Sequence, residues 1–125
     1  MEYKFTIPLK PITKKNSQRI VFTGSGRPFI IPSEAYTKYE KECRAYMPDI
    51  KTIESPVNVK AVYYMPTGRR VDLTNLHEAL HDILVHYEIL KDDNCKIIAS
   101  TDGSYVDVDK WHPRTEVTIS ELETG

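Results

Sequence analysis

Residues 73–87 read LTNLHEALHDILVHY, and this stretch decides how the chain folds. With Asp72 at 0° and each following residue turned by about 100° along a helix, the apolar side chains fall between about 20° and 120°. Those side chains are Leu73, Leu76, Leu80, Ile83, Leu84 and Tyr87. This single stripe predicts an amphipathic helix that packs against a sheet.

Strand-like segments lie on both sides of the predicted helix. Residues 56–65, PVNVKAVYYM, are rich in β-branched and aromatic side chains and predict a long strand. The turn 66–70, PTGRR, joins this strand to the helix. After the helix, residues 95–101 and the alternating residues 115–122 predict two further strands.

The amino-terminal third predicts a strand, a hairpin and a first helix. Residues 3–7 alternate between apolar and polar side chains and stop at a proline, which favours a half-buried strand. Residues 20–23 and 29–31 flank a turn that contains Gly and Pro, as in a hairpin. Ser33 is a good N-cap for a helix that ends before Pro48. The side chains that share one face of that helix are Tyr36, Tyr39, Cys43 and Met47.

The bulk composition is that of one globular domain spanning residues 1–125, with 40% hydrophobic and 28% charged residues. Strands bracket two helices in unequal runs, so we expect an α+β fold with a mixed β-sheet packed against two main helices. No apolar run approaches the roughly 20 residues of a transmembrane helix, and we expect no membrane partner. Cys43 and Cys95 lack C-x-x-C spacing, which favours reduced thiols in a cytoplasmic protein.

Charge is divided unevenly along the chain. Residues 1–60 carry 11 Lys and Arg against 6 Asp and Glu, a balance of +5, whereas residues 61–125 carry 6 against 12, a balance of −6. A basic half can meet a polyanion. The acidic half becomes compatible with the same polyanion when divalent cations neutralise its carboxylates.

Residues 77–81, HEALH, fit the H-E-x-x-H pattern of zinc peptidases, in which two histidines bind the metal and the Glu is the general base. No third-ligand motif follows His81. Glu78 also points about 60° to 100° away from the histidines on a helical wheel. We therefore expect His77 and His81 to be surface residues on an exposed helix flank, and a zinc peptidase is the minor alternative.

Acidic residues stand at both ends of the predicted helix. Two arginines precede the first Asp, and an Asp-Asp pair follows the helix. Residues 69–94 thereby resemble the RusA family of Holliday junction resolvases, the crossover junction endodeoxyribonucleases of phage and prophage type. The family pattern is basic–D-x-D-N-L-x-K-x-x-x-D-x-L, followed after a short interval by D-D. The residues that match in order and spacing are Arg69, Arg70, Asp72, Asn75, Leu76, Asp82, Leu84, Asp92 and Asp93.

The resemblance implies an Mg²⁺-dependent endodeoxyribonuclease that resolves four-way junctions in recombination and repair, with Mn²⁺ as a substitute metal. Two positions depart from the pattern, because Thr74 stands where the family has its second Asp and Glu78 where it has its Lys. Positions 74 and 78 lie on the same helical face, so Glu78 can restore the lost oxygen ligand. We expect Asp72, Glu78 and Asp93 to form the catalytic metal cluster, with Asp92 as a further ligand.

These carboxylates begin far apart in the chain. A helix of roughly 15 residues spans about 22 Å, so Asp72 and Asp93 meet only if the chain folds back. That happens if the strand beginning at residue 95 lies beside the strand that ends at Met65. Supporting roles fall to Thr74, Asn75, Asp82 and Lys91.

Basic side chains before each helix are expected to contact the DNA backbone. They are Lys10, Lys14, Lys15, Arg19, Arg69 and Arg70. Resolving a four-way junction requires cuts in two strands, which a two-fold symmetric homodimer provides, and the resemblance implies such a dimer. Because Thr74 and Glu78 depart from the pattern, the main alternative is a junction-binding protein of the same fold with impaired catalysis.

Overall fold

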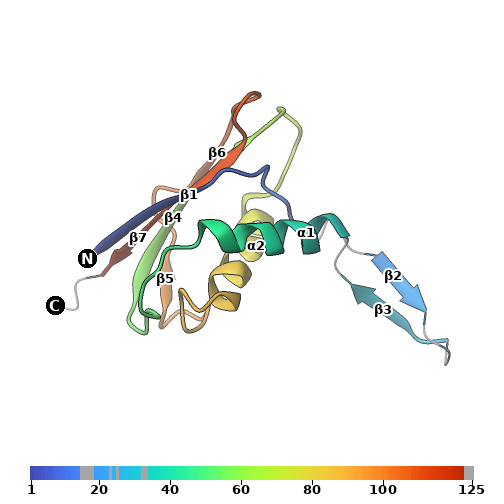
Figure 1. Cartoon of the computed structure of the whole chain (residues 1–125), viewed down its shortest axis with the longest axis horizontal. Helices are drawn as coiled ribbons and strands as arrows, with labels where there is room; N and C mark the ends of the chain where they lie inside the picture. Colours follow the sequence, from blue (N-terminus) through green and yellow to red (C-terminus); the bar gives the residue numbers. More distant parts are fainter. Residues whose placement is uncertain (15–18, 23, 25, 32–33, 123–125) are drawn as a thin grey trace.

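A mixed β-sheet forms the frame of the domain in the computed structural model (Figure 1). The structure describes residues 1–14, 19–22, 24, 26–31 and 34–122. The strands follow one another across the sheet as β1 (Glu2–Ile7), β7 (Arg114–Glu121), β4 (Val57–Met65) and β5 (Ile98–Ser100), with β6 (Tyr105–Val108) also paired to β4. β7 is antiparallel to both of its neighbours, whereas β5 and β6 run parallel to β4. The predicted α+β fold with a mixed sheet is confirmed.

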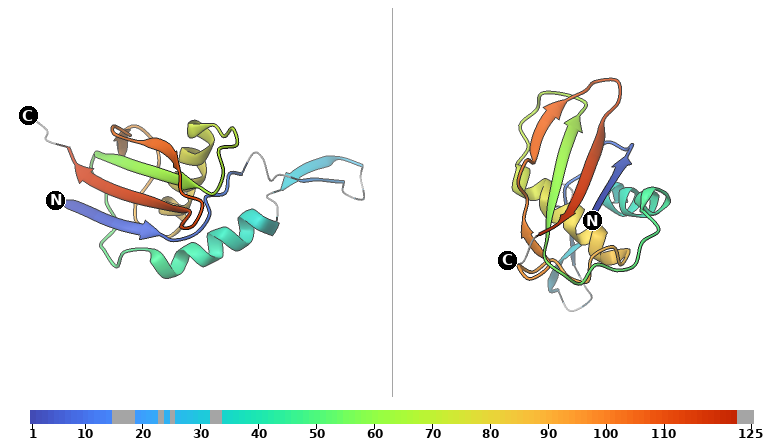
Figure 2. Two further views of the ribbon diagram at one scale, coloured as in Figure 1. Left: turned by 90° about the horizontal axis from the view of Figure 1, so that it is seen from above. Right: turned by 90° about the vertical axis from the view of Figure 1, so that its left-hand side faces the viewer.

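The sheet buries one face and leaves the other partly open to solvent. On the central strands β4 and β7, every second side chain is buried, as alternation along a strand requires. These side chains are Val57, Val59, Ala61, Tyr63, Thr115, Val117 and Ile119. Helices α1 (Glu34–Cys43) and α2 (Leu73–His86) contribute to the same core, and Figure 2 shows the helices and the sheet as separate layers.

The predicted apolar stripes of both helices are confirmed. In α2, four residues of the stripe are buried together with Ala79, and Leu73 and Tyr87 are partly buried. In α1, the tyrosines and Cys43 are buried. Helix α1 ends at Cys43, earlier than predicted, and continues as a 3₁₀ turn, η2 (Arg44–Tyr46). Pro48 ends this 3₁₀ turn, because it pushes the preceding Met47 into an extended backbone with ψ 137°. None of the described helices has the length and apolarity needed to cross a membrane.

The predicted hairpin is also present, as β2 (Arg19–Phe22) paired antiparallel with β3 (Pro28–Ile31). These strands form their own two-stranded sheet. Figure 1 shows the hairpin extending away from the main sheet, beyond the amino-terminal end of α1. Arg19, a predicted DNA contact, is the first residue of this hairpin.

The predicted start of the strand after α2 is wrong. It begins at Ile98 rather than at residue 95, because Asn94 forms a turn: its side-chain oxygen accepts the Lys96 amide at 2.9 Å and its carbonyl accepts the Ile97 amide at 3.0 Å. β5 lies beside β4, as predicted, and pairs with its start, where Ile98 lies opposite Val57. Helix α2 runs back along β4 as a crossover, so the chain re-enters the sheet where β4 begins.

Strand β6 was not predicted from the sequence. Its four residues continue the line of β5 and pair with the second half of β4, from Val62 to Met65. Between β5 and β6 the chain turns at Gly103, which has φ +87°, and Asn58 of β4 accepts the Asp102 amide at 2.7 Å. Four alternating residues are too few to give a clear period-two pattern in the sequence. The segment becomes a strand because its backbone pairs with β4.

Candidate active site

Asp72 stands at the start of α2 with its carboxylate exposed. Its backbone is extended and its side chain makes no capping hydrogen bond to the helix. Instead, Asn75 Nδ2 donates to Asp72 Oδ2 at 3.3 Å. The predicted supporting residue Asn75 thus orients the carboxylate of Asp72. Thr74, between them, is exposed on the same turn of the helix.

The second acidic group is the turn after α2. Asp92 Oδ1 accepts the backbone amide of Asp93 at 2.7 Å, and Oδ2 accepts Asn94 Nδ2 at 2.9 Å. These hydrogen bonds hold the pKa of Asp92 below its usual range. For Asp93 the pKa is raised, first by partial burial and then by the carboxylates of Asp92 and Asp82. Asp93 therefore faces other negative charges, which a bound cation would neutralise.

One chain does not bring the two acidic groups together. Asp72 follows the end of β4, whereas Asp93 precedes β5, which pairs with the start of β4. The 14 residues of α2 separate them, a length of about 21 Å. Among the residues that the structure describes, no group of three His, Cys, Asp or Glu side chains could hold a metal ion. The carboxylates fit Mg²⁺ in kind, but a single chain presents them at opposite edges of the sheet.

Glu78 and Asp82 lie on the part of α2 that faces α1. Tyr36 of α1 has its pKa raised mainly by burial, and the carboxylates of Glu40, Asp82 and Glu78 add to the effect. Lys14 Nζ forms an ion pair of 2.5 Å with Asp82 and lies 5.5 Å from the centroid of the Tyr36 ring. Lys14 was predicted to contact DNA, and this ion pair with a residue of α2 could not be read from sequence spacing.

In the HEALH segment, His77 contacts the sheet and the His81 ring stacks on the His77 ring. His77 Nδ1 lies 2.7 Å from the hydroxyl of Tyr63 on β4, and the His77 and His81 rings stack with their centroids 5.4 Å apart. Burial lowers the pKa of His77, and burial together with His77 lowers that of His81 to about 4. The prediction of exposed surface histidines is therefore wrong. Their ring atoms are engaged in packing and in the bond to Tyr63, an arrangement that gives no support to the zinc-peptidase alternative.

Basic side chains gather at the edge of the sheet where β1 and β4 end. Arg69 and Arg70 are exposed there and line a hollow of about 500 Å³ together with Lys10. Because β1 and β4 both pair antiparallel with β7, their ends lie at the same edge. We call Lys10, Arg69 and Arg70 the basic edge. Lys15, another predicted DNA contact, lies outside the described residues.

Lys91 lies beside the acidic turn in sequence but pairs elsewhere in the structure. Its Nζ is 3.2 Å from Glu54 Oε1, and both side chains are more than half exposed, at 65% and 61%. Exposed pairs of this kind contribute little to stability, so Lys91 can leave Glu54 at small cost.

Comparison with known proteins places these features in a family. A family model described as endodeoxyribonuclease RusA matches residues 8–120, a range that includes both acidic groups and the basic edge. The chain belongs to the RusA endodeoxyribonuclease family. The resemblance of residues 69–94 is thereby confirmed, and the RusA family consists of Holliday junction resolvases, nucleases that bind branched DNA. No curated protein matches the chain.

Proposed function

We propose that this member of the RusA family is a metal-dependent, structure-specific endonuclease that resolves four-way DNA junctions, with Mg²⁺ as cofactor and Mn²⁺ as a substitute. The match over residues 8–120 is the observation that carries this proposal. We also propose a cytoplasmic location, because buried Cys43 and exposed Cys95 are both free.

The carboxylates proposed to act in catalysis are Asp72, Glu78 and Asp93, with Asp92 as a further metal ligand. Two of them are already oriented, Asp72 by Asn75 and Asp92 by the hydrogen bonds of its own turn. A divalent cation bound to such oxygens would neutralise charge on the phosphate and activate the attacking water. Glu78, one helical turn after Thr74, would supply the carboxylate that the family pattern has at position 74.

We further propose that a second copy of the chain completes each metal site. Within one chain, α2, which is about 21 Å long, lies between Asp72 and the Asp92–Asp93 turn. A two-fold axis perpendicular to α2 would set the start of one α2 beside the end of the other, and so bring Asp72 of one copy near Asp93 of its partner. Such a homodimer has two equivalent sites, which matches the two symmetric cuts that junction resolution requires.

The DNA backbone is proposed to lie along the basic edge, with Arg19, the first residue of the hairpin, and Lys15 as further contacts. Arg69 and Arg70 are exposed, so their charges are available to phosphates. Lys14 contributes less than these arginines because Asp82 already neutralises it.

A cleavage assay on a synthetic four-way junction tests the function. We expect cleavage with Mg²⁺ or Mn²⁺ and none with EDTA. Asp72→Asn and Asp93→Asn should abolish cleavage while retaining junction binding, and Asp102→Asn, an exposed acid outside the acidic groups, should cleave like wild type. A wild-type protein that binds the junction but cleaves with neither metal would support instead the alternative, a junction-binding protein with impaired catalysis.

A further inference from the structure

The turn between β6 and β7 presents the only tryptophan of the chain to solvent. Trp111 is 78% exposed, the highest exposure among the large apolar side chains that the structure describes as exposed. Tryptophan usually buries most of its surface because its apolar area is large. An exposed indole suits recognition of a partner when the backbone that carries it is fixed before binding.

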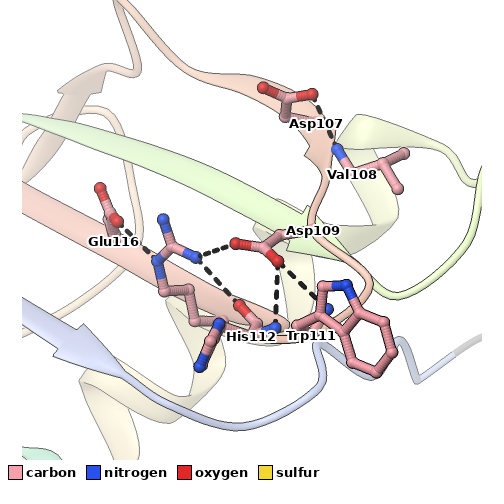
Figure 3. Close-up of polar contacts among 7 residues, drawn as sticks. Asp107, Val108, Asp109, Trp111, His112 and Glu116 are labelled. Atoms are coloured by element: carbon pink, nitrogen blue, oxygen red, sulfur yellow. Dashed lines mark hydrogen bonds and ion pairs between the residues drawn. The ribbon is translucent and has the colours of Figure 1, made fainter.

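The backbone around Trp111 is fixed by Asp109 (Figure 3). Asp109 Oδ1 accepts the amides of Trp111 and His112 at 3.2 and 3.0 Å. Its Oδ2 accepts Arg114 Nη1 at 2.8 Å, and the same Nη1 donates to the carbonyl oxygen of His112 at 2.9 Å. The amide of Asp109 itself donates to the carbonyl of Met65 at 2.9 Å, so the turn is tied to the end of β4.

Arg114 is held on its other side by the open face of the sheet. Its Nε donates to Glu116 Oε2 at 2.7 Å, and its Cζ lies 3.8 Å from the centroid of the Tyr64 ring. The guanidinium is therefore engaged in anchoring the turn and is not free for a phosphate. Since the turn is already ordered, Trp111 loses little conformational entropy on binding.

Two lysines lie near the indole. Lys110 Nζ lies 5.1 Å from the centroid of the Trp111 ring. Trp111 also borders a hollow of about 400 Å³ that Lys10 lines, and Lys10 lines the neighbouring hollow together with Arg69 and Arg70. The indole therefore stands at one end of the basic edge, where an anionic partner is favoured over a cationic or purely apolar one.

We propose that Trp111 stacks on an exposed nucleobase of branched DNA whose backbone lies along the basic edge. This inference rests on the proposed function. Stacking of a base on an aromatic ring tolerates any sequence, because every base has a π-face. Bases at a branch point are exposed at lower cost than bases within a continuous duplex, where the stack hides their faces. Trp111 would therefore favour junctions over plain duplex.

The single tryptophan allows a direct test by its own fluorescence. Wild-type protein is titrated in EDTA with a synthetic four-way junction and with a duplex of matched sequence. We expect the junction to quench the indole emission strongly and the duplex to quench it much less. Trp111→Ala should weaken junction binding about tenfold and Trp111→Phe by less, because a smaller ring still stacks. Tyr46→Ala removes an exposed aromatic residue on η2 and should bind like wild type.

The outcomes separate this inference from the function on which it rests. Junction binding with unchanged emission, and with equal affinity for Trp111→Ala, overturns the stacking role and leaves the nuclease intact. If the emission changes with protein concentration in the absence of DNA, the indole lies in a contact between two copies of the chain. That result also overturns the stacking role. A wild-type protein that binds no junction at all overturns both proposals.

Discussion

The hydroxyl of Tyr63 lies 2.7 Å from Nδ1 of His77, a contact that joins the central strand β4 to helix α2. Burial raises the pKa of Tyr63, so the phenol keeps its proton and donates, while Nδ1 accepts. The His77 proton then resides on Nε2. The His81 ring stacks on the His77 ring at an interplanar angle of 7°. A polar contact thus helps to position the helix that carries the acidic residues.

Tyr63→Phe should destabilise the fold by about 1–2 kcal/mol, because it leaves a half-buried Nδ1 without a donor. The measurement is urea unfolding at pH 7, where both histidines are neutral. The matched variants are His77→Leu and the double variant Tyr63→Phe/His77→Leu. If the contact matters, the double variant loses less stability than the sum of the single ones, and simple additivity would contradict it.

Stability should fall between pH 6.5 and pH 4 because of His81. Its pKa drops on folding from 6.5 to about 4, so in this window the unfolded chain binds more protons than the folded one. The contribution is complete above pH 6.5 and decreases by up to about 3 kcal/mol as the pH falls to 4. Urea midpoints at several pH values provide the measurement. His81→Leu should show a flatter profile over the same range, and equal slopes for both proteins would count against this role.

Mixing two inactive variants should restore cleavage if each metal site is shared between copies. In a heterodimer of Asp72→Asn with Asp93→Asn, one site receives both substitutions and the other receives neither. The intact site should cut one strand of the junction, which appears as nicked product after co-refolding. The control is the Asp72→Asn variant alone, taken through the same refolding. No rescue from verified heterodimers would place the site within one chain.

The basic edge should set the salt dependence of junction binding. Each phosphate contact contributes about 0.9 to the slope of log affinity against log salt, so Arg70→Ala should lower the slope by about one. Lys14→Ala should change it less and should lower stability instead, since Asp82 loses its partner. Lys51→Ala, exposed near the other ends of β1 and β4, is the matched control. Equal slopes for Arg70→Ala and Lys51→Ala would remove Arg70 from the interface.

Glu78 should be essential if it replaces the carboxylate missing at position 74. Glu78→Ala is expected to lower the rate of Mg²⁺-dependent cleavage by at least about a hundredfold, the usual scale for loss of an electrostatic group in an active site. Thr74→Asp/Glu78→Lys, which restores the family pattern, should recover much of the rate. Full activity of Glu78→Ala would show that the exchange is not compensatory.

Local patterns in the sequence sufficed for most elements and for the family. The apolar stripe of α2, the alternation of β7 and the two strands of the hairpin each depend on residues within a few positions, and the structure has all three. The periodicity of apolar residues did not predict the strands correctly where the pattern was short or ambiguous. β6 has only four residues. After α2, the side-chain hydrogen bond of Asn94 forms a turn in a segment whose residues favour a strand.

The sequence by itself determined which segments form helices, which of their faces are apolar and which acids belong to the RusA pattern, because these depend on near neighbours in the chain. Only the tertiary structure decided that β5 pairs with the start of β4, which separates Asp72 from Asp93. It also decided that Lys14 pairs with Asp82 and that His77 bonds to Tyr63. These contacts join residues distant in sequence, and they form only because packing α2 against the sheet fixes where its two ends and its polar flanks lie.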